Sequence, residues 1–453
     1  MSSPKVIESV VNQDLCIGCG ICIDRCPSKA IEMDWNDYGF LVPELQENCD
    51  SHGECIKSCP FNPLPQNEVK TENEIGERFL KNTNHHHPRI GKYNNLYAGY
   101  STEYRLTSSS GGIATYVLAE LLKRGIVQHV ISVNESDKSN NHYDYSVSSS
   151  VVELLGASKT KYYPVSMSNA FSKISELDGK VAIVGVACFL KAIRLVQYQD
   201  PVLNKKIKFL VGIICGGVKS RFFTEFLAGQ VGVEKDEYEE PQFRIKDMNS
   251  TAGDYSFGCN SSNDIEQRTL KMKSVGDMWG TGLFKANACD FCDDVTTELA
   301  DISLGDAWLK PYNADGKGTN VIVTRSLLSE QIITDGINKN EIIAEDLDID
   351  RFLASQRGGF RHRQNALSFR MKEKNISLPK RFVNENISFA FKIVQRIRMN
   401  IRSKSLKIWR SKSDSANFNT VIYKDLEKLK NYTKIYHYYD GMLRKLRFWR
   451  KEF

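Results

Sequence analysis

The sequence predicts a mixed fold in three parts: a small α+β module, a larger α/β domain and a basic helical tail. Three observations support this prediction. Closely spaced cysteines fill the first 65 residues, short apolar runs alternate with amphipathic segments from about residue 96, and apolar and basic residues alternate after residue 379. At 453 residues the chain is too long for one ordinary domain, so a division into several parts is expected.

Composition narrows the class of protein. No stretch offers the roughly 20 uninterrupted apolar residues that a membrane-spanning helix requires, and the first 15 residues do not resemble a secretory signal. We therefore expect a cytoplasmic protein, and a peripheral position at the inner membrane face is left open. In a reducing compartment, 12 cysteines favour metal ligands over disulfides, and seven of them lie between Cys16 and Cys59.

The first part, residues 1–65, carries a C-x2-C-x2-C-x3-C-P run with the spacing of bacterial iron-sulfur ferredoxins. In two-cluster proteins of this type, three cysteines of a run hold one 4Fe-4S cube and the fourth ligates the other cube. The first cube would therefore take Cys16, Cys19, Cys22 and Cys59. The second cube would take Cys26, Cys49 and Cys55, and it lacks a fourth cysteine.

His52 stands where that fourth cysteine would be. Three arrangements are open: His52 binds iron through an imidazole nitrogen, a 3Fe-4S cluster forms without the corner iron, or water or Asp50 completes the cube. A histidine ligand would raise the reduction potential, as in Rieske centres. An ordinary polar loop residue beside the cluster is an equally good interpretation of His52.

Two connecting segments follow from turn and composition signals. Asp37-Tyr38-Gly39 lies between apolar flanks and predicts the turn of a short hairpin that joins the two cysteine groups. Residues 66–95 are polar and are interpreted as a linker. Their three adjacent histidines, 85–87, cannot all face one metal ion from regular structure, so a solvated segment is expected.

The second part, residues 96–378, is the predicted α/β domain. Two buried-strand runs, Val181 to Val186 and Phe209 to Ile214, each lead into a cysteine, Cys188 and Cys215. Parallel strands gather their ligands at their C-terminal ends, so these thiols are expected to converge. With the C-x2-C pair of Cys289 and Cys292 they make four, the number that one cube needs.

Simpler interpretations of the central cysteines also exist. A single cysteine such as Cys188 or Cys215 is commonly a small core residue, and the close pair alone could hold zinc with other partners. Cys259 receives no role.

A glycine-rich segment precedes a predicted helix that starts at Ile113, from which apolar residues recur at helical spacing. The segment contains Ser109, Ser110, Gly111 and Gly112. Such residues leave backbone N–H groups open to a phosphate, and the helix dipole favours the anion. A serine is also an ordinary N-cap, which is the competing interpretation.

The third part, residues 379–453, is strongly basic. From Lys380 to Phe453 there are 19 Lys and Arg against 6 Asp and Glu, so this part carries +13 and the rest of the +6 chain carries −7. Basic helices with aromatic residues suit an anionic membrane surface or an acidic partner; no nucleic acid partner is expected. A helical hairpin packed on the body is equally consistent. Four arginines just before the tail either meet an anionic substrate or pair with the acidic body: Arg357, Arg361, Arg363 and Arg370.

In their order, these motifs resemble the beta-subunit family of coenzyme F-420 hydrogenases and dehydrogenases. The resemblance covers about residues 10–370 and rests on the series SSSGG, GVAC, IICGGVKS, FRIKD, CDFC and ADISLGDAW. The ferredoxin-type module and the segments GASK and DGKGTN look more like the bacterial branch, many of whose members sit in surface-polysaccharide clusters. Two departures occur: GVACF replaces the usual G-x-P-C-Q, and IICGG lacks a histidine that is common after the cysteine.

The resemblance implies an iron-sulfur flavoprotein oxidoreductase that passes electrons between 4Fe-4S clusters and FAD. It implies a third cluster on Cys188, Cys215, Cys289 and Cys292. The implied flavin contacts are Ser109, Ser110, Gly111, Gly112, Lys159, Arg244 and Lys246. The partners would be a ferredoxin or similar electron carrier and an unidentified small-molecule substrate, and no catalytic residue is assigned. A non-catalytic electron-transfer subunit that feeds a separate enzyme is the alternative.

Overall fold

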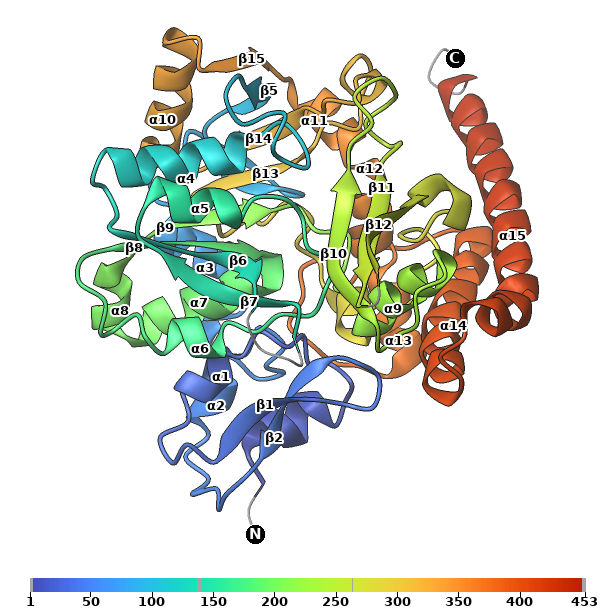
Figure 1. The fold of residues 1–453 in the computed structure, drawn as a ribbon, viewed down its shortest axis with the longest axis horizontal. Helices are drawn as coiled ribbons and strands as arrows, with labels where there is room; N and C mark the ends of the chain where they lie inside the picture. The colour runs from blue at the N-terminus through green and yellow to red at the C-terminus, as the bar shows by residue number, and fades with distance from the viewer. Residues whose placement is uncertain (1–2, 137–140, 263, 450–453) are drawn as a thin grey trace.

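The computed structural model describes residues 3–136, 141–262 and 264–449, except for the side chains of residues 264, 265 and 443–449. One large mixed sheet forms its centre (Figure 1). A small cysteine-rich module lies at one end, and two long helices, α14 (Phe389–Ser411) and α15 (Ser415–Trp449), lie along one side. The predicted combination of a small cysteine-rich α+β module with a mixed α/β domain is confirmed.

The module contains a hairpin between two short helices. Its elements are η1 (Ile7–Val11), α1 (Ile21–Asp24), β1 (Ile31–Trp35), β2 (Leu41–Leu45) and α2 (Glu54–Lys57). β1 and β2 pair antiparallel, and the chain turns at Asp37-Tyr38-Gly39 as predicted, with Gly39 at a φ of 69°.

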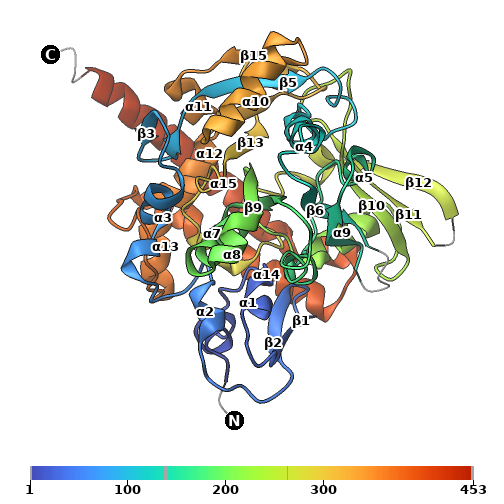
Figure 2. The ribbon, with the colours of Figure 1, turned by 90° about the vertical axis from the view of Figure 1, so that its left-hand side faces the viewer.

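The module shares its core with the large domain. Cys19, Ile21 and Phe61 belong to the same hydrophobic cluster as Met167 and Phe189. The backbone N–H of Met167 also donates to the carbonyl oxygen of Cys19 over 3.0 Å. The module is therefore packed against the sheet domain as part of one body, and Figure 2 shows it at the end opposite β5 (Leu96–Ser101) and β15 (Ile342–Asp346).

Residues 66–95, predicted as a linker, are ordered. They form η2 (Asn67–Val69), α3 (Glu72–Phe79) and a hairpin of β3 (His85–His87) and β4 (Gly91–Tyr93). α3 starts with a capping box between Thr71 and Glu74. The polar composition of this segment suggested exposure to solvent, but Glu72 is buried and pairs with Lys191 over 3.1 Å.

The large sheet has eight strands in the order β15-β5-β14-β13-β9-β8-β6-β7. The strands not yet located are β6 (His129–Glu135), β7 (Tyr143–Ser148), β8 (Val181–Val186), β9 (Ile207–Ile213), β13 (Ile302–Asp306) and β14 (Asn320–Thr324). The four strands β6, β8, β9 and β13 run parallel, and antiparallel strands flank them on both sides.

Helices cover both faces of this sheet because its side chains alternate between two cores. Val181 and Ile183 of β8 pack with Phe189 of α7 (Ala187–Gln199), whereas Ala182 packs in the cluster that contains α4 (Ile113–Lys123) and α10 (Leu327–Asn338). Strands buried on both faces are typical of parallel sheets. The remaining helices are α5 (Val151–Gly156), α6 (Ser168–Phe171), α8 (Pro201–Lys206), α9 (Arg221–Gln230), α11 (Ile349–Ser355), α12 (Arg357–Phe360) and α13 (Leu367–Lys374).

A second, three-stranded antiparallel sheet lies beside the large one in Figure 1. It consists of β10 (Tyr238–Ile245), β11 (Ser256–Ser261) and β12 (Asp264–Lys271). Short helical turns, η3 (Met272–Val275), η4 (Asn287–Phe291), η5 (Tyr312–Ala314) and η6 (Arg361–Asn365), connect these parts.

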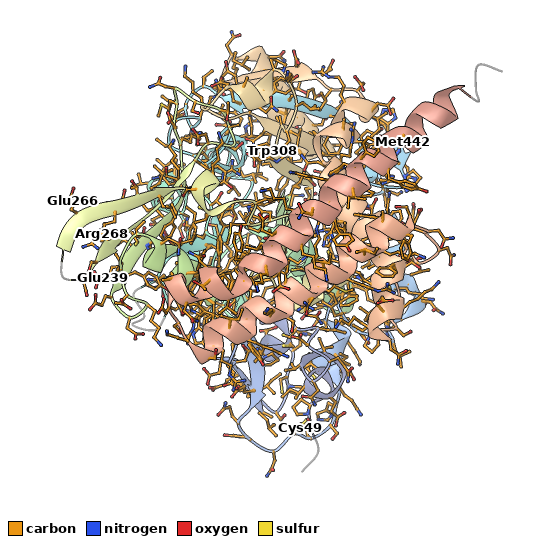
Figure 3. All side chains as sticks on the ribbon, turned by 90° about the vertical axis from the view of Figure 1, so that its right-hand side faces the viewer. Cys49, Glu239, Glu266, Arg268, Trp308 and Met442 are labelled. Carbon is orange, nitrogen blue, oxygen red and sulfur yellow. The ribbon has the colours of Figure 1, made fainter. Side chains whose placement is uncertain are left out.

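The tail forms a helical hairpin that packs on the body over most of its length. Trp409 of α14 is buried and donates from Nε1 to Glu225 over 2.6 Å, and Phe418 of α15 stacks on Phe284 with ring centroids 4.9 Å apart. α15 continues along α14 as far as Tyr436, which stacks on Phe391 with ring centroids 4.5 Å apart, and Figure 3 shows its C-terminal end extending past the body. The alternation of apolar and basic residues predicted for the tail continues after Met442, for example at Phe448, and those side chains lie outside the described residues.

None of the helices in the described ranges combines the length and the apolar character that crossing a bilayer requires.

Candidate iron-sulfur and flavin sites

The four cysteines assigned to the first cube line one small cavity in the module. They come from the loop before α1, from α1 itself and from the segment directly after α2. The rest of the lining is almost entirely apolar and includes Val6, Ile17 and Phe61. Within this described lining there is no charged side chain, and the four thiols are its strongest ligands for iron.

Backbone N–H groups point at these thiols. Gly18 donates to Cys16, Ile21 donates to Cys19, and Phe61 donates to Cys59. Burial raises the pKa of Cys16 to about 12 and that of Cys19 to about 11. A buried thiolate needs a compensating charge, and bound iron together with N–H donors provides it. The donor set therefore fits an iron-sulfur cluster.

The three cysteines assigned to the second cube also lie together. Burial raises the pKa of Cys55, and Cys26 and Cys49 add to this rise. His52 lies apart from them at the surface: its side chain is 58% exposed, and its Nε2 is 3.0 Å from Asp50 Oδ2. The structure thus joins His52 to Asp50, and the occupant of the fourth corner stays a prediction.

The four central cysteines come together at the C-terminal ends of two neighbouring parallel strands. Cys188 follows β8, Cys215 follows β9, and Cys289 and Cys292 lie on and directly after η4. Burial, then Cys292, Cys289 and Cys215 raise the pKa of Cys188 far above its usual range.

Cys19 of the first group also raises the pKa of Cys188. In the module, Cys55 similarly raises the pKa values of Cys22 and Cys59. The three cysteine groups therefore form a series: the Cys55 group at the outside, the Cys19 group in the middle and the Cys188 group inside.

Hydrogen-bond donors also surround the central thiols. Gly217 N donates to Cys215 Sγ and Val218 N donates to Cys289 Sγ, each over 3.2 Å. Arg363 Nη1 donates to Cys292 Sγ over 3.6 Å. Among the described residues, no group of three or more His, Cys, Asp or Glu side chains is arranged to hold a single metal ion. The donor set fits a group that takes four thiolates.

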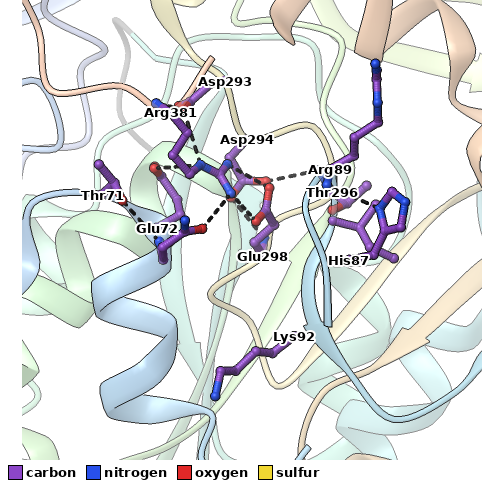
Figure 4. A network of polar contacts seen from close by, with 12 residues as sticks. Thr71, Glu72, His87, Arg89, Lys92, Asp293, Asp294, Thr296, Glu298 and Arg381 are labelled. Carbon is purple, nitrogen blue, oxygen red and sulfur yellow. Dashed lines mark hydrogen bonds and ion pairs between the residues drawn. The ribbon is translucent and has the colours of Figure 1, made fainter. Parts of the chain in front are cut away.

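A buried charge network ties the segment after Cys292 to α3 (Figure 4). Arg381 forms two hydrogen bonds with Glu298, of 2.6 and 2.8 Å, and contacts Asp293 over 3.3 Å. Glu72 of α3 lies 3.8 Å from the same guanidinium. The network explains why residues 66–95 are ordered, and it joins the first residues of the predicted tail to the centre of the protein.

The segment 109–112 precedes α4 as expected and leaves its backbone donors open. Within the described part of the chain, the N–H groups of Ser109, Ser110, Gly111 and Gly112 have no acceptor. Gly112 has a φ of 79°, and its close neighbour Tyr104 leaves no room for a side chain there. Successive free N–H groups at the start of an 11-residue helix form a site that suits a phosphate.

Lys246 closes one side of this segment. Its Nζ donates to the carbonyl oxygens of Arg105, Ser110 and Lys317 over 2.5, 2.8 and 2.7 Å. All three N–H groups of the ammonium are therefore used, and Lys246 positions the loops instead of meeting a phosphate directly.

The other two predicted flavin contacts, Arg244 and Lys159, differ in how firmly they are held. Arg244, at the end of β10, is held by Asp306 of the LGDAW segment over 2.5 and 2.9 Å. Lys159 is exposed in the loop that follows α5, next to Thr160, whose N–H donates to Ser109 Oγ over 2.9 Å. The structure thus groups the predicted flavin residues around the start of α4.

An aromatic pair that the sequence did not single out lies between the two sites. Trp279 packs on Gly216, next to Cys215, and its ring meets Tyr162 edge-on with centroids 4.7 Å apart. Tyr162 in turn forms a hydrogen bond with Arg244. The surrounding residues TGLFKANACDFC would have pointed to this segment only through the C-x2-C pair.

Comparison with known families agrees with this layout. Residues 96–172 and 178–350 match the models for the N-terminal and C-terminal parts of the coenzyme F420 hydrogenase/dehydrogenase beta subunit. Residues 15–62 match the 4Fe-4S dicluster domain. The two beta-subunit models together cover more than half of the chain.

Individual relatives share modest identity. A coenzyme F420-dependent sulfite reductase from Methanocaldococcus jannaschii is 24% identical over 358 residues, which are 74% of this chain and 49% of that protein. One subunit of the F(420)H(2) dehydrogenase of Methanosarcina mazei is 24% identical over 315 residues, 67% of this chain and 78% of that protein. A ferredoxin from Moorella thermoacetica is 44% identical over 65 residues, 13% of this chain and 98% of the ferredoxin. The chain spans about half the length of the first relative.

Proposed function

Because the chain belongs to the family of coenzyme F420 hydrogenase/dehydrogenase beta subunits, we propose that it is an iron-sulfur flavoprotein oxidoreductase that passes electrons between 4Fe-4S clusters and FAD. One observation carries the proposal: four central thiols meet beside the four-cysteine cavity of the module, and contacts through Trp279, Tyr162 and Arg244 connect them to the proposed phosphate segment. When bound, the clusters would carry single electrons, and FAD would exchange them with a two-electron substrate.

Each proposed cluster has its own residues. The first takes Cys16, Cys19, Cys22 and Cys59, the second takes Cys26, Cys49 and Cys55 with His52, Asp50, water or no iron at the fourth corner, and the third takes Cys188, Cys215, Cys289 and Cys292. These residues bind iron as thiolates, and the backbone N–H groups around them stabilise that charge. The mostly apolar lining of the first cavity would limit the access of water to a bound cluster.

The FAD site would use the start of α4. The free N–H groups of residues 109–112 bind a phosphate, and Lys246 holds the loops of Arg105, Ser110 and Lys317 around it. Arg244, fixed by Asp306, presents a positive charge to the reduced ring system, and Lys159 screens the phosphates from outside.

The substrate class follows from the family only in outline. A ferredoxin or a deazaflavin would supply or accept electrons, and the other substrate is a small molecule, with surface-polysaccharide metabolism as the proposed setting. The predicted parts stay our working division: 1–65 for the ferredoxin-type module, 66–95 as its connection, 96–378 for the flavin and iron-sulfur domain and 379–453 for the tail.

The test supplies electrons from one end and records their arrival at the other. The anaerobically loaded full chain is mixed with reduced ferredoxin, and the flavin absorbance is followed. We expect bleaching in the wild type and, in Cys215→Ala, a rate lower by more than about tenfold, because a ligand of the proposed central cluster is lost. Cys259→Ala is the matched control, since Cys259 is a buried cysteine of β11 outside all three groups.

A non-catalytic electron-transfer protein gives a different result in the same experiment. It would purify without flavin and show no bleaching, yet it would still accept electrons into its N-terminal clusters.

We also propose that the exposed stripe of α15 attaches the protein to an anionic membrane surface. Val421, Ile435, Tyr439 and Met442 are exposed apolar residues that recur at helical spacing on one stripe of α15. Lys424 and Lys428 lie on the same stripe. Apolar and aromatic residues with interspersed lysines suit the surface of a membrane that contains acidic lipids.

The tail must be tested by substitution, because deletion after residue 379 would remove buried Trp409 and Arg402. Ile435→Ser with Lys424→Gln and Lys428→Gln should abolish flotation with phosphatidylglycerol vesicles. Lys412→Gln with Lys430→Gln removes basic charges outside the stripe and should leave flotation intact. Equal flotation of both variants, or none in the wild type, contradicts the membrane proposal.

A further inference from the structure

Arg363 lies buried among the central cysteines. Its Nη1 is 3.6 Å from Cys292 Sγ and 2.9 Å from the carbonyl oxygen of Asp294. Its Nη2 donates to the carbonyl oxygen of Cys215 over 2.6 Å. The guanidinium therefore bridges the segment after β9 and the segment after η4, which both supply ligands of the proposed central cluster.

The positive charge of Arg363 is not cancelled by a carboxylate in the described residues. Asp290, which stands between Cys289 and Cys292, is already neutralised by Lys285 over 2.5 Å and Arg402 over 3.0 Å, with His362 at 3.3 Å.

The two other acids near Cys292 also have partners elsewhere. Asp293 pairs with Arg381 and Lys380. The carboxylate of Asp294 accepts hydrogen bonds from the backbone N–H groups of Thr296 and Glu298. The field of Arg363 therefore acts mainly on the thiols, and apart from burial Arg363 has the largest influence on the pKa of Cys292, which it lowers.

The neighbouring four-cysteine cavity of the module has a different electrostatic character. Its described lining contains no charged side chain, and Cys16, Cys19 and Cys59 receive backbone N–H donors only. Asp14 lies outside this lining, and its negative charge raises the pKa of Cys16. Of these two neighbouring cysteine groups, the central one faces a buried cation and the Cys19 group of the module does not.

We propose that Arg363 raises the reduction potential of the central cluster above that of the adjacent cluster in the module, so that electrons run inward towards the flavin. A cluster gains one negative charge when it accepts an electron, and a buried positive charge stabilises that form. Each inward transfer oxidises the module cluster by one electron and reduces the central cluster by one. A reduced ferredoxin or similar iron-sulfur protein replaces the electron. The inference rests on the proposed function, because it requires a cluster on the central cysteines.

The experiment is an EPR-monitored redox titration of the full, anaerobically loaded chain. Cys292→Ala first identifies the signal of the central cluster by its loss. In the wild type, we expect this signal to have a more positive midpoint potential than the signal of the adjacent module cluster, which is the one proposed on Cys16, Cys19, Cys22 and Cys59. Arg363→Gln should shift only the central midpoint, to a more negative value, which corresponds to an inward equilibrium constant lower by on the order of tenfold. Arg363→Lys should retain most of the wild-type midpoint.

Arg361→Gln is the control, because Arg361 lies on the same helical turn but pairs with Asp440 near the surface. It should leave every midpoint unchanged. A central midpoint below that of the module cluster in the wild type, or one that Arg363→Gln does not move, overturns the inference alone. If Arg363→Gln fails to assemble the cluster, the order of wild-type midpoints and the Arg363→Lys value decide. The absence of a third signal from the wild type overturns this inference and the central cluster together.

Discussion

At the residue scale, Lys246 is the clearest example of a side chain that shapes a site without occupying it. Its ammonium donates three hydrogen bonds to carbonyl oxygens of two loops that flank the start of α4. Each bond from a charged donor contributes about 1.5–3 kcal/mol. Loss of these bonds would therefore separate the loops that we propose to enclose the FAD phosphates.

Lys246 gives a pH prediction. Burial, with help from Arg105 and Arg244, lowers its pKa to about 8. A neutral amine has two N–H groups, so one of the three bonds is lost as the pH rises through 8. We expect the affinity for FAD to fall above pH 8 in the wild type. Lys246→Met should bind FAD at least roughly tenfold more weakly at every pH and show no such step.

The titration of Lys246 affects folding stability in the opposite direction from its effect on FAD affinity. Its pKa falls from 10.5 to about 8 on folding, so between these values the unfolded chain binds more protons and this group adds stability as the pH rises. Flavin loss above pH 8, with no lower melting temperature of the flavin-free chain, is therefore the expected result. Lys271→Met, on the exposed side of β12, is the control and should keep the wild-type step. The same step in Lys246→Met would exclude Lys246 as its source.

Residue types alone could predict the thiols but not what surrounds them. The spacing of Cys16 to Cys59 predicts cluster ligands, because an iron-sulfur cluster of this type requires thiolates at fixed intervals. Arg363 and Lys246 look like ordinary basic residues in the sequence, and only packing decides that one meets Cys292 and the other meets three carbonyl groups. His52 shows the same limit, since its partner in the structure is Asp50.

At the element scale, the two ends of α4 allow a matched test of the proposed phosphate site. Gly112 before the helix has a φ of 79°, and Gly125 after it has a φ of 63°. A Cβ at Gly112 would lie 2.6 Å from the carbonyl carbon of Tyr104, whereas a Cβ at Gly125 would meet nothing within 4 Å. Gly125→Ala thus carries only the cost of the left-handed backbone, about 1–2 kcal/mol.

We expect Gly125→Ala to lower the free energy of unfolding by that amount and to retain FAD. Gly112→Ala should be less stable than Gly125→Ala and should lose FAD, because relief of the clash displaces the N–H groups of residues 109–112. Flavin quantification and urea unfolding measure both effects. Full FAD retention in Gly112→Ala would show that the start of α4 is not the phosphate site.

Strands and their ends were predictable where the pattern was local. The two apolar runs that lead into Cys188 and Cys215 form β8 and β9, which pair in parallel. The structure of segment 66–95 was not predictable, because it depends on residues far away in the sequence. Glu72 meets Lys191 and Arg381 only after folding. From its composition such a charged helix is predicted to be exposed to solvent, although the carboxylate of Glu72 is buried.

At the scale of the whole molecule, the parts predicted from the sequence share their cores. The module packs in one hydrophobic cluster with Met167 and Phe189, and the tail places Trp409 and Phe418 in another with Phe226. The charge count could predict that the tail is basic, and the alternation of apolar and basic residues could predict that it is helical. They could not predict that α14 is part of the core, because that depends on which face of α14 meets α9 and the segment around Phe284.

The shared core also explains how the proposed clusters form a series. The module is fixed so that Cys19 approaches Cys188, and Gly20 is pressed against Ser166, where a Cβ would lie 2.0 Å from Oγ. A module on a flexible linker would not hold this approach. The tight contact therefore supports direct transfer between the two groups.

The central claim is tested most directly by counting iron and flavin in the anaerobically purified chain. Three cubes and one FAD predict about 12 irons, or about 11 if the second cluster is trinuclear, with one flavin per chain. Cys292→Ala should reduce the count by about four irons and leave the N-terminal EPR signals in place. A wild-type count of about 8 irons that Cys292→Ala does not change would contradict the central cluster, and a chain without flavin would contradict the oxidoreductase proposed here.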